Sequence, residues 1–261
     1  MRYVRLYKEF FKQSLMKLMA YRVNFFLVFI TNFAYFAVQL IFLQVIYSKV
    51  DSLAGWTKYE MILYIGTFNI IDSLWVFGPY FNLLNVPELI RSGMLDYYIT
   101  KPGNSQFIIS LRNVDIGSLI SVLAGAAIVG YALAAGSMTL TFGRLLLYII
   151  AIFHALLVEY AVYFILTCLS FWTVKSEFVE KVHGIVCYFS TRPVDIYKGF
   201  IRIILTYILP YGFVMTIASK SAVKSIDAGG YVSFILMSWC FFAASILFWR
   251  FSLSKYSSAS S

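Results

Sequence analysis

Three long stretches of this chain contain no Asp, Glu, Lys or Arg: residues 23–48, 116–143 and 228–249. A helix of about 20 mostly apolar residues is long enough to cross the hydrocarbon core of a bilayer. Each stretch exceeds that length, so we expect each one to hold a membrane-spanning helix. The chain is 61% hydrophobic and 13% charged, whereas a soluble domain carries about 25% charged residues. This composition excludes an ordinary soluble enzyme and a disordered segment.

Three further stretches are apolar but carry a charge inside or at one end. Asp72 and Glu159 each lie within one of them, and the last follows Arg202. We therefore predict an all-α integral membrane protein, a single domain over residues 1–261 with six transmembrane helices. The predicted spans are about 23–47, 59–81, 114–135, 144–171, 201–219 and 230–250.

Basic residues are distributed unevenly between the connections of this six-span arrangement. The two termini and the second and fourth connections together hold 16 Lys and Arg, and the alternate connections hold 5. Because Lys and Arg accumulate in cytoplasmic loops, we predict that both termini are cytoplasmic. The net charge of +9 then serves orientation and contact with lipid head groups, and we expect no nucleic-acid partner.

Both ends of the chain have features of their own. Residues 1–22 are expected to form an amphipathic helix on the inner leaflet. Its apolar stripe recurs at helical spacing and comprises Tyr3, Tyr7, Phe10, Ser14 and Leu18. Residues 252–261 end in a run of Ser and Ala, and we predict a flexible tail there.

Motifs for chemistry are absent from the sequence. It contains no G-x-x-x-x-G-K-[ST], no H-E-x-x-H and no G-x-S-x-G, so we assign no nucleotide site and no catalytic residue. The three cysteines, Cys168, Cys187 and Cys240, are far apart in apolar sequence. They fit neither a disulfide framework nor metal-ligand spacing. With two histidines in the chain, we also expect no histidine-rich metal site.

Three ionisable residues lie inside predicted spans: Asp72, His154 and Glu159. A charge at the centre of a membrane helix costs roughly 2.5–3.5 kcal/mol, so such residues face the bundle interior. His154 and Glu159 are five residues apart, which places them about 140° around the helix from each other. This spacing disfavours a proton relay between them. A structural role, a polar pathway and ion coupling all stay open for Asp72.

Small residues and a proline predict two further details of packing. Gly117, Ser121 and Gly125 repeat every four residues, a spacing that lets helix backbones approach closely. Pro210 interrupts the fifth predicted span, so a broken helix is expected there.

The connection between the second and third spans contains a helix signal. Asn85 is a suitable N-cap, Pro87 suits the first turn, and Glu88 completes a pattern like a capping box. Gly93 is a natural stop. We predict a short cytoplasmic helix at about residues 86–98, which another protein could bind.

Two motifs resemble a known family. The run I-R-S-G-M-L-D-Y-Y-I-T-K-P at residues 90–102 resembles the G-x-L-D-x-x-L-x-K/R-P motif of type-2 ABC transporter permeases. A later run, from Arg192-Pro193 through Ile196-Tyr197 to residues 210–213, resembles the bacterial branch of small six-span permeases. The resemblance extends over essentially the whole chain.

The resemblance implies a permease subunit without an ATP site of its own. Separate ABC ATP-binding subunits would hold ATP and Mg, and a second permease, identical or homologous, would complete the complex. The 86–98 helix would be the coupling helix, and residues 1–22 the connecting helix. The expected coupling residues are Glu88, Arg91, Gly93, Leu95, Asp96, Lys101 and Pro102.

The implied function is ATP-driven export across the bacterial cytoplasmic membrane. Aromatic residues make up 19% of the chain, which favours a hydrophobic or amphipathic cargo such as a lipid, a drug or a peptide. Two other readings stay open. One is an ion-coupled secondary transporter that uses Asp72, His154 or Glu159, and the other is a membrane scaffold that transports nothing.

Overall fold

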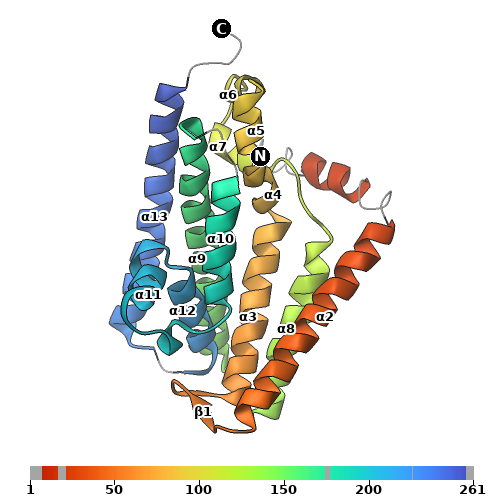
Figure 1. The fold of residues 1–261 in the computed structure, drawn as a ribbon, viewed down its shortest axis with the longest axis vertical. Helices are drawn as coiled ribbons and strands as arrows, with labels where there is room; N and C mark the ends of the chain where they lie inside the picture. Colours follow the sequence, from red (N-terminus) through yellow and green to blue (C-terminus); the bar gives the residue numbers. More distant parts are fainter. Residues whose placement is uncertain (1–7, 17–21, 174–176, 225, 257–261) are drawn as a thin grey trace.

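The structure is a computed structural model that describes residues 8–16, 22–173, 177–224 and 226–256, with the backbone alone for 22–29 and 32. Long helices run side by side along the vertical axis of Figure 1. They are α2 (Arg22–Tyr47), α3 (Lys58–Phe77), α8 (Ser118–Ala135), α9 (Phe142–Cys168), α10 (Glu177–Ser190) and α13 (Ala228–Lys255).

Short elements connect the long helices at both ends of the bundle. Strands β1 (Ser52–Leu53) and β2 (Trp56–Thr57) pair as an antiparallel hairpin, and we call this the hairpin end. The opposite end we call the α5 end. It holds the short helices α4 (Tyr80–Leu84), α5 (Val86–Arg91), α6 (Leu95–Ile99) and α7 (Ser105–Leu111), and the 3-10 turn η1 (Leu169–Phe171).

The chain between α10 and α13 forms four more elements. They are the 3-10 turn η2 (Val194–Ile196), α11 (Gly199–Ile203), the π-helical η3 (Ile204–Ile208) and α12 (Tyr211–Val223).

Four helices among the described residues are long and apolar enough to cross a membrane: α3, α8, α9 extended through η1, and α13. The all-α class and an integral membrane protein are thereby confirmed. The first predicted span lies in α2, which has 26 residues. Its segment Phe33–Tyr47 is apolar but shorter than the four helices above. A total of six spans stays a prediction.

The fifth predicted span, residues 201–219, is not one straight helix. Its two parts, Gly199–Ile208 and Tyr211–Val223, are bent by 80° at the break between them. Pro210 lies at this break and has no backbone N–H to continue the first helix. Its carbonyl oxygen instead accepts a hydrogen bond from the Val214 N–H at 3.0 Å, within α12. The bend at Pro210 therefore agrees with the broken helix that the sequence predicts.

Helix α10 connects the two ends of the bundle instead. Near its start, Val179 packs in a cluster with Leu83 and Val86 at the α5 end. At its end, the carbonyl oxygen of Ser190 accepts a hydrogen bond from the Tyr64 hydroxyl at 2.8 Å. Asp195 follows and accepts a hydrogen bond from the indole N–H of Trp56, at the hairpin end, at 3.0 Å.

Apolar residues lie on both faces of α10. The buried face holds Val179, His183, Val186 and Ser190. Phe178 and Ile185 are 53% and 58% exposed on the other side. The exposed side also carries the ion pair of Lys181 and Glu177 at 3.4 Å, so it holds both apolar and charged residues. The sequence places residues 172–200 in a cytoplasmic connection, and in the structure α10 packs among the long helices between the two ends of the bundle.

The place of α10 in the bundle changes the count of basic residues in the two groups of connections. Arg192, Lys198 and Arg202 follow α10 and so move from the first group of connections to the second. The count becomes 13 Lys and Arg against 8, taken from the 21 in the chain. The first group of connections keeps the larger number, so the predicted orientation is unchanged.

The predicted terminal segments are described in part. Residues 8–16 are helical, with Phe10 and Ser14 half-buried and the Ser14 hydroxyl accepting a hydrogen bond from the Val114 N–H at 3.1 Å. Residues 1–7 and 17–21 of the predicted connecting helix lie outside the described residues. Helix α13 continues to Lys255 with Ser252 fully buried, so the first four residues of the predicted flexible tail are helical. Residues 257–261 lie outside the described residues.

The closest approach of two long helices is between α3 and α8, where glycine meets glycine. A Cβ added to Gly125 would lie 2.9 Å from the carbonyl oxygen of Gly66 and 2.9 Å from a side-chain carbon of Ile70. The carbonyl oxygen of Ser121, one turn earlier, accepts a hydrogen bond from the Asn69 side chain at 3.1 Å. The predicted small-residue repeat therefore marks this helix contact.

We predict that Gly125→Ala destabilises the protein by about 1–3 kcal/mol, because the added methyl group must displace backbone atoms of α3. Gly130 lies on the same helix with nothing within 4 Å of its added Cβ. Gly130→Ala is the matched control and should be neutral or stabilising by up to about 1 kcal/mol. Thermal unfolding in detergent checks this pair, and equal midpoints would contradict the packing described here.

Candidate functional site

The predicted coupling segment is two short helices with a turn between them. Helix α5 ends at Arg91, and α6 begins at Leu95. Gly93 lies in the turn with φ of 71°, a left-handed conformation that suits glycine. The predicted stop at Gly93 agrees with this turn, and the expected continuous helix over 86–98 does not.

The predicted cap at Asn85 is absent, and a different asparagine holds the segment. The Asn85 side chain makes no capping hydrogen bond, and Glu88 instead pairs with Arg91 at 2.7 Å. Asn82 is fully buried. Its side-chain N–H groups donate to the carbonyl oxygens of Gly78 at 2.9 Å and Asn113 at 2.7 Å, and its side-chain oxygen accepts from the Asn113 N–H at 3.0 Å. Asn82 thus ties the start of α5 to the loop before α8.

One face of this segment is buried and the other is exposed. Val86, Leu89 and Leu95 pack in an apolar cluster with Trp75 and Trp249. Leu95 is 0% exposed, so it anchors the segment and is not available to a partner. Among the predicted coupling residues, Leu95 is thus the one buried beneath the segment.

The exposed face we call the α5–α6 tip, and it carries Glu88, Arg91, Met94 and Tyr97. Met94 and Tyr97 are 53% and 56% exposed. The Lys101 ammonium lies 3.7 Å from the centre of the Tyr97 ring, which fixes the ring in place.

The other predicted coupling residues surround the tip. Asp96 and Gly93 are half-buried, and Pro102 is exposed. Sequence reasoning missed Met94 and Tyr97, although their three-residue spacing within the motif places them on one side of a helical turn.

The intramembrane ionisable residues are divided between two places. Asp72 is half-buried and interacts electrostatically with Glu159 and His183, so α3, α9 and α10 each contribute one ionisable residue to a group inside the bundle. His154 lies elsewhere: its Nδ1 is 2.8 Å from the carbonyl oxygen of Ile150, and its ring packs on Phe234. His183 was missed because residues 172–200 were expected in the cytoplasm.

The surroundings of His183 are aromatic. Its ring centre lies 4.8 Å from that of Tyr163, 5.7 Å from that of Tyr80 and 5.7 Å from that of Tyr211. The Glu159 side chain is 0% exposed, and its Oε1 lies 3.8 Å from the His183 Nε2. Cys187 follows one turn after His183, with its Sγ 3.4 Å from the same Nε2.

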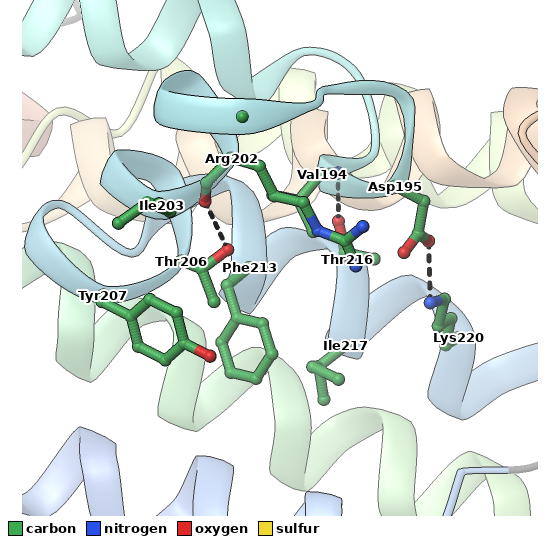
Figure 2. A pocket seen from close by; sticks show the side chains of 11 residues that line it. Val194, Asp195, Arg202, Ile203, Thr206, Tyr207, Phe213, Thr216, Ile217 and Lys220 are labelled. Atoms are coloured by element: carbon green, nitrogen blue, oxygen red, sulfur yellow. Dashed lines mark hydrogen bonds and ion pairs between the residues drawn. The ribbon is translucent and has the colours of Figure 1, made fainter.

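A cavity of about 480 Å³ lies near the hairpin end, between η2, α11–η3 and α12. Figure 2 shows Asp195 and Lys220 on one side of it and the rings of Tyr207 and Phe213 on the other. Asp195 and Lys220 form an ion pair at 2.7 Å. No described residue pairs with the guanidinium of Arg202, which also lines the cavity.

Hydrogen bonds fix the rim of this cavity. The Val194 N–H donates to the Thr216 hydroxyl at 2.9 Å, and the Tyr197 hydroxyl donates to the carbonyl oxygen of Phe189 at 2.7 Å. Burial raises the pKa of the Tyr197 phenol, so this group stays protonated and keeps its role as a donor. The sequence did not predict the cavity, because the residues that line it come from both sides of the bend at Pro210.

The chain was compared with known protein families and with curated proteins. The family model described as ABC-2 family transporter protein matches residues 33–260. This range covers most of the chain, including the α5–α6 tip, the buried ionisable group and the cavity near the hairpin end. No curated protein matches.

Proposed function

The chain belongs to the ABC-2 family of transporter proteins, and on that premise we propose that it is the permease subunit of an ATP-driven exporter. The family implies association with ABC ATPase partners in general. A separate ATPase fits this chain, because its sequence contains no phosphate-binding loop. The observation that carries the proposal is the structure of the α5–α6 tip. Its outer face is exposed, and the residues beneath it are packed in an apolar cluster with the long helices.

The tip has the properties of a docking element. Met94 and Tyr97 offer apolar and aromatic contact area, and such residues are frequent at the centre of interfaces. Beneath them, Leu95 and Leu89 are buried against Trp75 of α3 and Trp249 of α13. A force on the tip would therefore be passed to membrane helices rather than absorbed by a loose loop.

We propose that the α5 end lies in the cytoplasm and the hairpin end outside. In this arrangement α10 crosses the bilayer together with α2, α3, α8, α9 and α13. The bent segment Gly199–Val223 then enters the outer part of the membrane and returns to the outer surface. Irregular backbone at that depth is tolerated where protein or a polar cavity covers it, and the cavity near the hairpin end satisfies this condition.

The cavity supports an amphipathic cargo with an anionic head group. Asp195 and Lys220 neutralise each other, so Arg202 contributes the uncompensated charge of the lining. Tyr207, Phe213 and Ile217 provide the apolar side. A second permease chain, identical or homologous, is part of the proposal, with the cargo path between the two chains.

The first test is co-purification of the chain with the ABC ATP-binding subunit encoded beside it, followed by an ATPase assay. We expect stoichiometric capture and vanadate-sensitive ATP hydrolysis. Tyr97→Ala should weaken the affinity for the ATPase subunit roughly 30-fold, the loss expected for an interface anchor worth about 2 kcal/mol. Tyr188→Ala is the matched control, because Tyr188 is also exposed (63%) but lies near the end of α10 that is far from the tip.

A wild-type chain that purifies without any ATPase would overturn the proposed function and favour the ion-coupled reading. Equal affinities of Tyr97→Ala and Tyr188→Ala would overturn the assignment of the tip alone.

The second test addresses the cargo. Arg202→Ala should reduce the ATPase stimulation by a fluorescent anionic phospholipid about tenfold or more, since a charged hydrogen bond contributes about 1.5–3 kcal/mol. Arg144→Ala is the control, because Arg144 lies near the start of α9 and does not line the cavity. With a zwitterionic lipid, the difference in ATPase stimulation between Arg202→Ala and Arg144→Ala should be smaller. Equal responses of both variants to the anionic lipid would contradict the anionic-cargo proposal.

A further inference from the structure

The carboxylate of Glu159 has an unusual environment. It lies inside α9 with 0% of the residue exposed, and no described residue donates a hydrogen bond to either of its oxygens. A buried carboxylate is costly unless it is paired, hydrogen-bonded or bound to a metal. The His183 Nε2 lies 3.8 Å from the Glu159 Oε1. This distance is too long for a hydrogen bond.

Two further donor atoms face this carboxylate from one side of α10. His183 and Cys187 are four residues apart and therefore lie on the same helix face. The Cys187 Sγ is 3.4 Å from the His183 Nε2. The three potential ligand atoms, one from each residue, all lie within 4.8 Å of one another.

These separations fit a tetrahedral metal ion. Zinc binds nitrogen and oxygen at about 2.0–2.2 Å and sulfur at about 2.3 Å, so ligand atoms in a tetrahedral site are roughly 3.3–3.6 Å apart. The observed 3.4 Å between sulfur and nitrogen and 3.8 Å between nitrogen and oxygen are close to these values. The sulfur and the carboxylate oxygen lie no more than 4.8 Å apart, a gap that side-chain rotation can shorten.

We propose that Glu159, His183 and Cys187 bind one Zn²⁺ ion that links α9 to α10. The Glu159 carboxylate and the Cys187 thiolate balance the two charges of the ion, and the thiol proton is released to solvent on binding. The result is a neutral centre in an apolar bundle. A thiolate and an imidazole favour zinc over the harder Mg²⁺ and Ca²⁺.

Three protein ligands leave a fourth position for water. Asp72 interacts electrostatically with both Glu159 and His183 and would lie beyond the ligands. The Tyr163 hydroxyl has no hydrogen-bond partner among the described residues, and its ring packs against His183. The sequence did not indicate this site, because Glu159 lies 24 positions before His183 and on another helix.

The test measures metal bound to the full-length chain, purified in detergent with its partner subunits. After chelator treatment and dialysis, the protein receives Zn²⁺ alone, and bound zinc is counted by mass spectrometry. We expect one equivalent per chain in the wild type. His183→Ala and Cys187→Ser should weaken zinc binding at least about 100-fold, because even the loss of an outer partner costs 10–100-fold.

Two controls share the chemistry of the ligands but not their place. His154→Ala and Cys240→Ser should retain one equivalent of zinc, because neither residue belongs to the group.

A second measurement does not depend on the folding of the histidine variant. Co²⁺ added to the wild type should produce the charge-transfer absorption of a thiolate bound to cobalt. The Cys240→Ser control should produce the same absorption, and Cys187→Ser should not. A wild type that binds neither Zn²⁺ nor Co²⁺ overturns the proposal. A Cys187→Ser variant that binds as much metal as the wild type also overturns the proposal. ATPase capture is scored separately, so failure here leaves the proposed function standing.

Discussion

The Tyr64 hydroxyl fixes the path of α10 through the bundle, and the arrangement of both ends depends on that path. Tyr64 is fully buried on α3, and its hydroxyl lies 2.8 Å from the carbonyl oxygen of Ser190 and 3.0 Å from that of Arg192. Carbonyls at the end of a helix have no donor within the helix. In an apolar bundle such groups must find a partner, so the end of α10 is held beside α3 at the hairpin end.

A consequence of this path is that one helix reaches three places of functional interest. Helix α10 begins at the apolar cluster beneath the α5–α6 tip, where Val179 packs. In the middle of this helix, His183 lies beside Glu159 of α9 and beside Cys187. It then leads into η2, where Val194 and Asp195 line the cavity near the hairpin end. If a partner displaces the tip, α10 therefore provides a continuous rigid element that can transmit the displacement to the cavity.

Much of the fold could be predicted from residue patterns, because long, mostly apolar runs leave few alternatives. The helices α3, α8, α9 and α13 follow from such runs, the bend follows from Pro210, and the turn after α5 follows from Gly93. A helical stripe in α10 is visible in the sequence, but a membrane crossing by α10 was not predicted. Its first turns carry Glu177, Glu180 and Lys181, which is typical of a solvated helix, and its 14 residues are fewer than a span normally needs.

The candidate sites were harder to predict than the helices, because they depend on contacts between distant segments. Asn85 has the sequence context of a cap, yet Asn82 makes the buried hydrogen bonds, since only its side chain faces Asn113. Leu95 lies within the family motif but is buried. Glu159 was predicted only as one of three intramembrane ionisable candidates, and its neighbours on α10 depend on the path of that helix.

A path of α10 across the membrane is tested directly by cysteine labelling in intact cells. Cys168, Cys187 and Cys240 are first replaced by Ser, and single cysteines are introduced by Lys198→Cys and Ser92→Cys at exposed positions. We predict that a membrane-impermeant maleimide labels Lys198→Cys in intact cells, and Ser92→Cys only after the cells are opened. Protection of both positions in intact cells would place residue 198 in the cytoplasm and contradict the account.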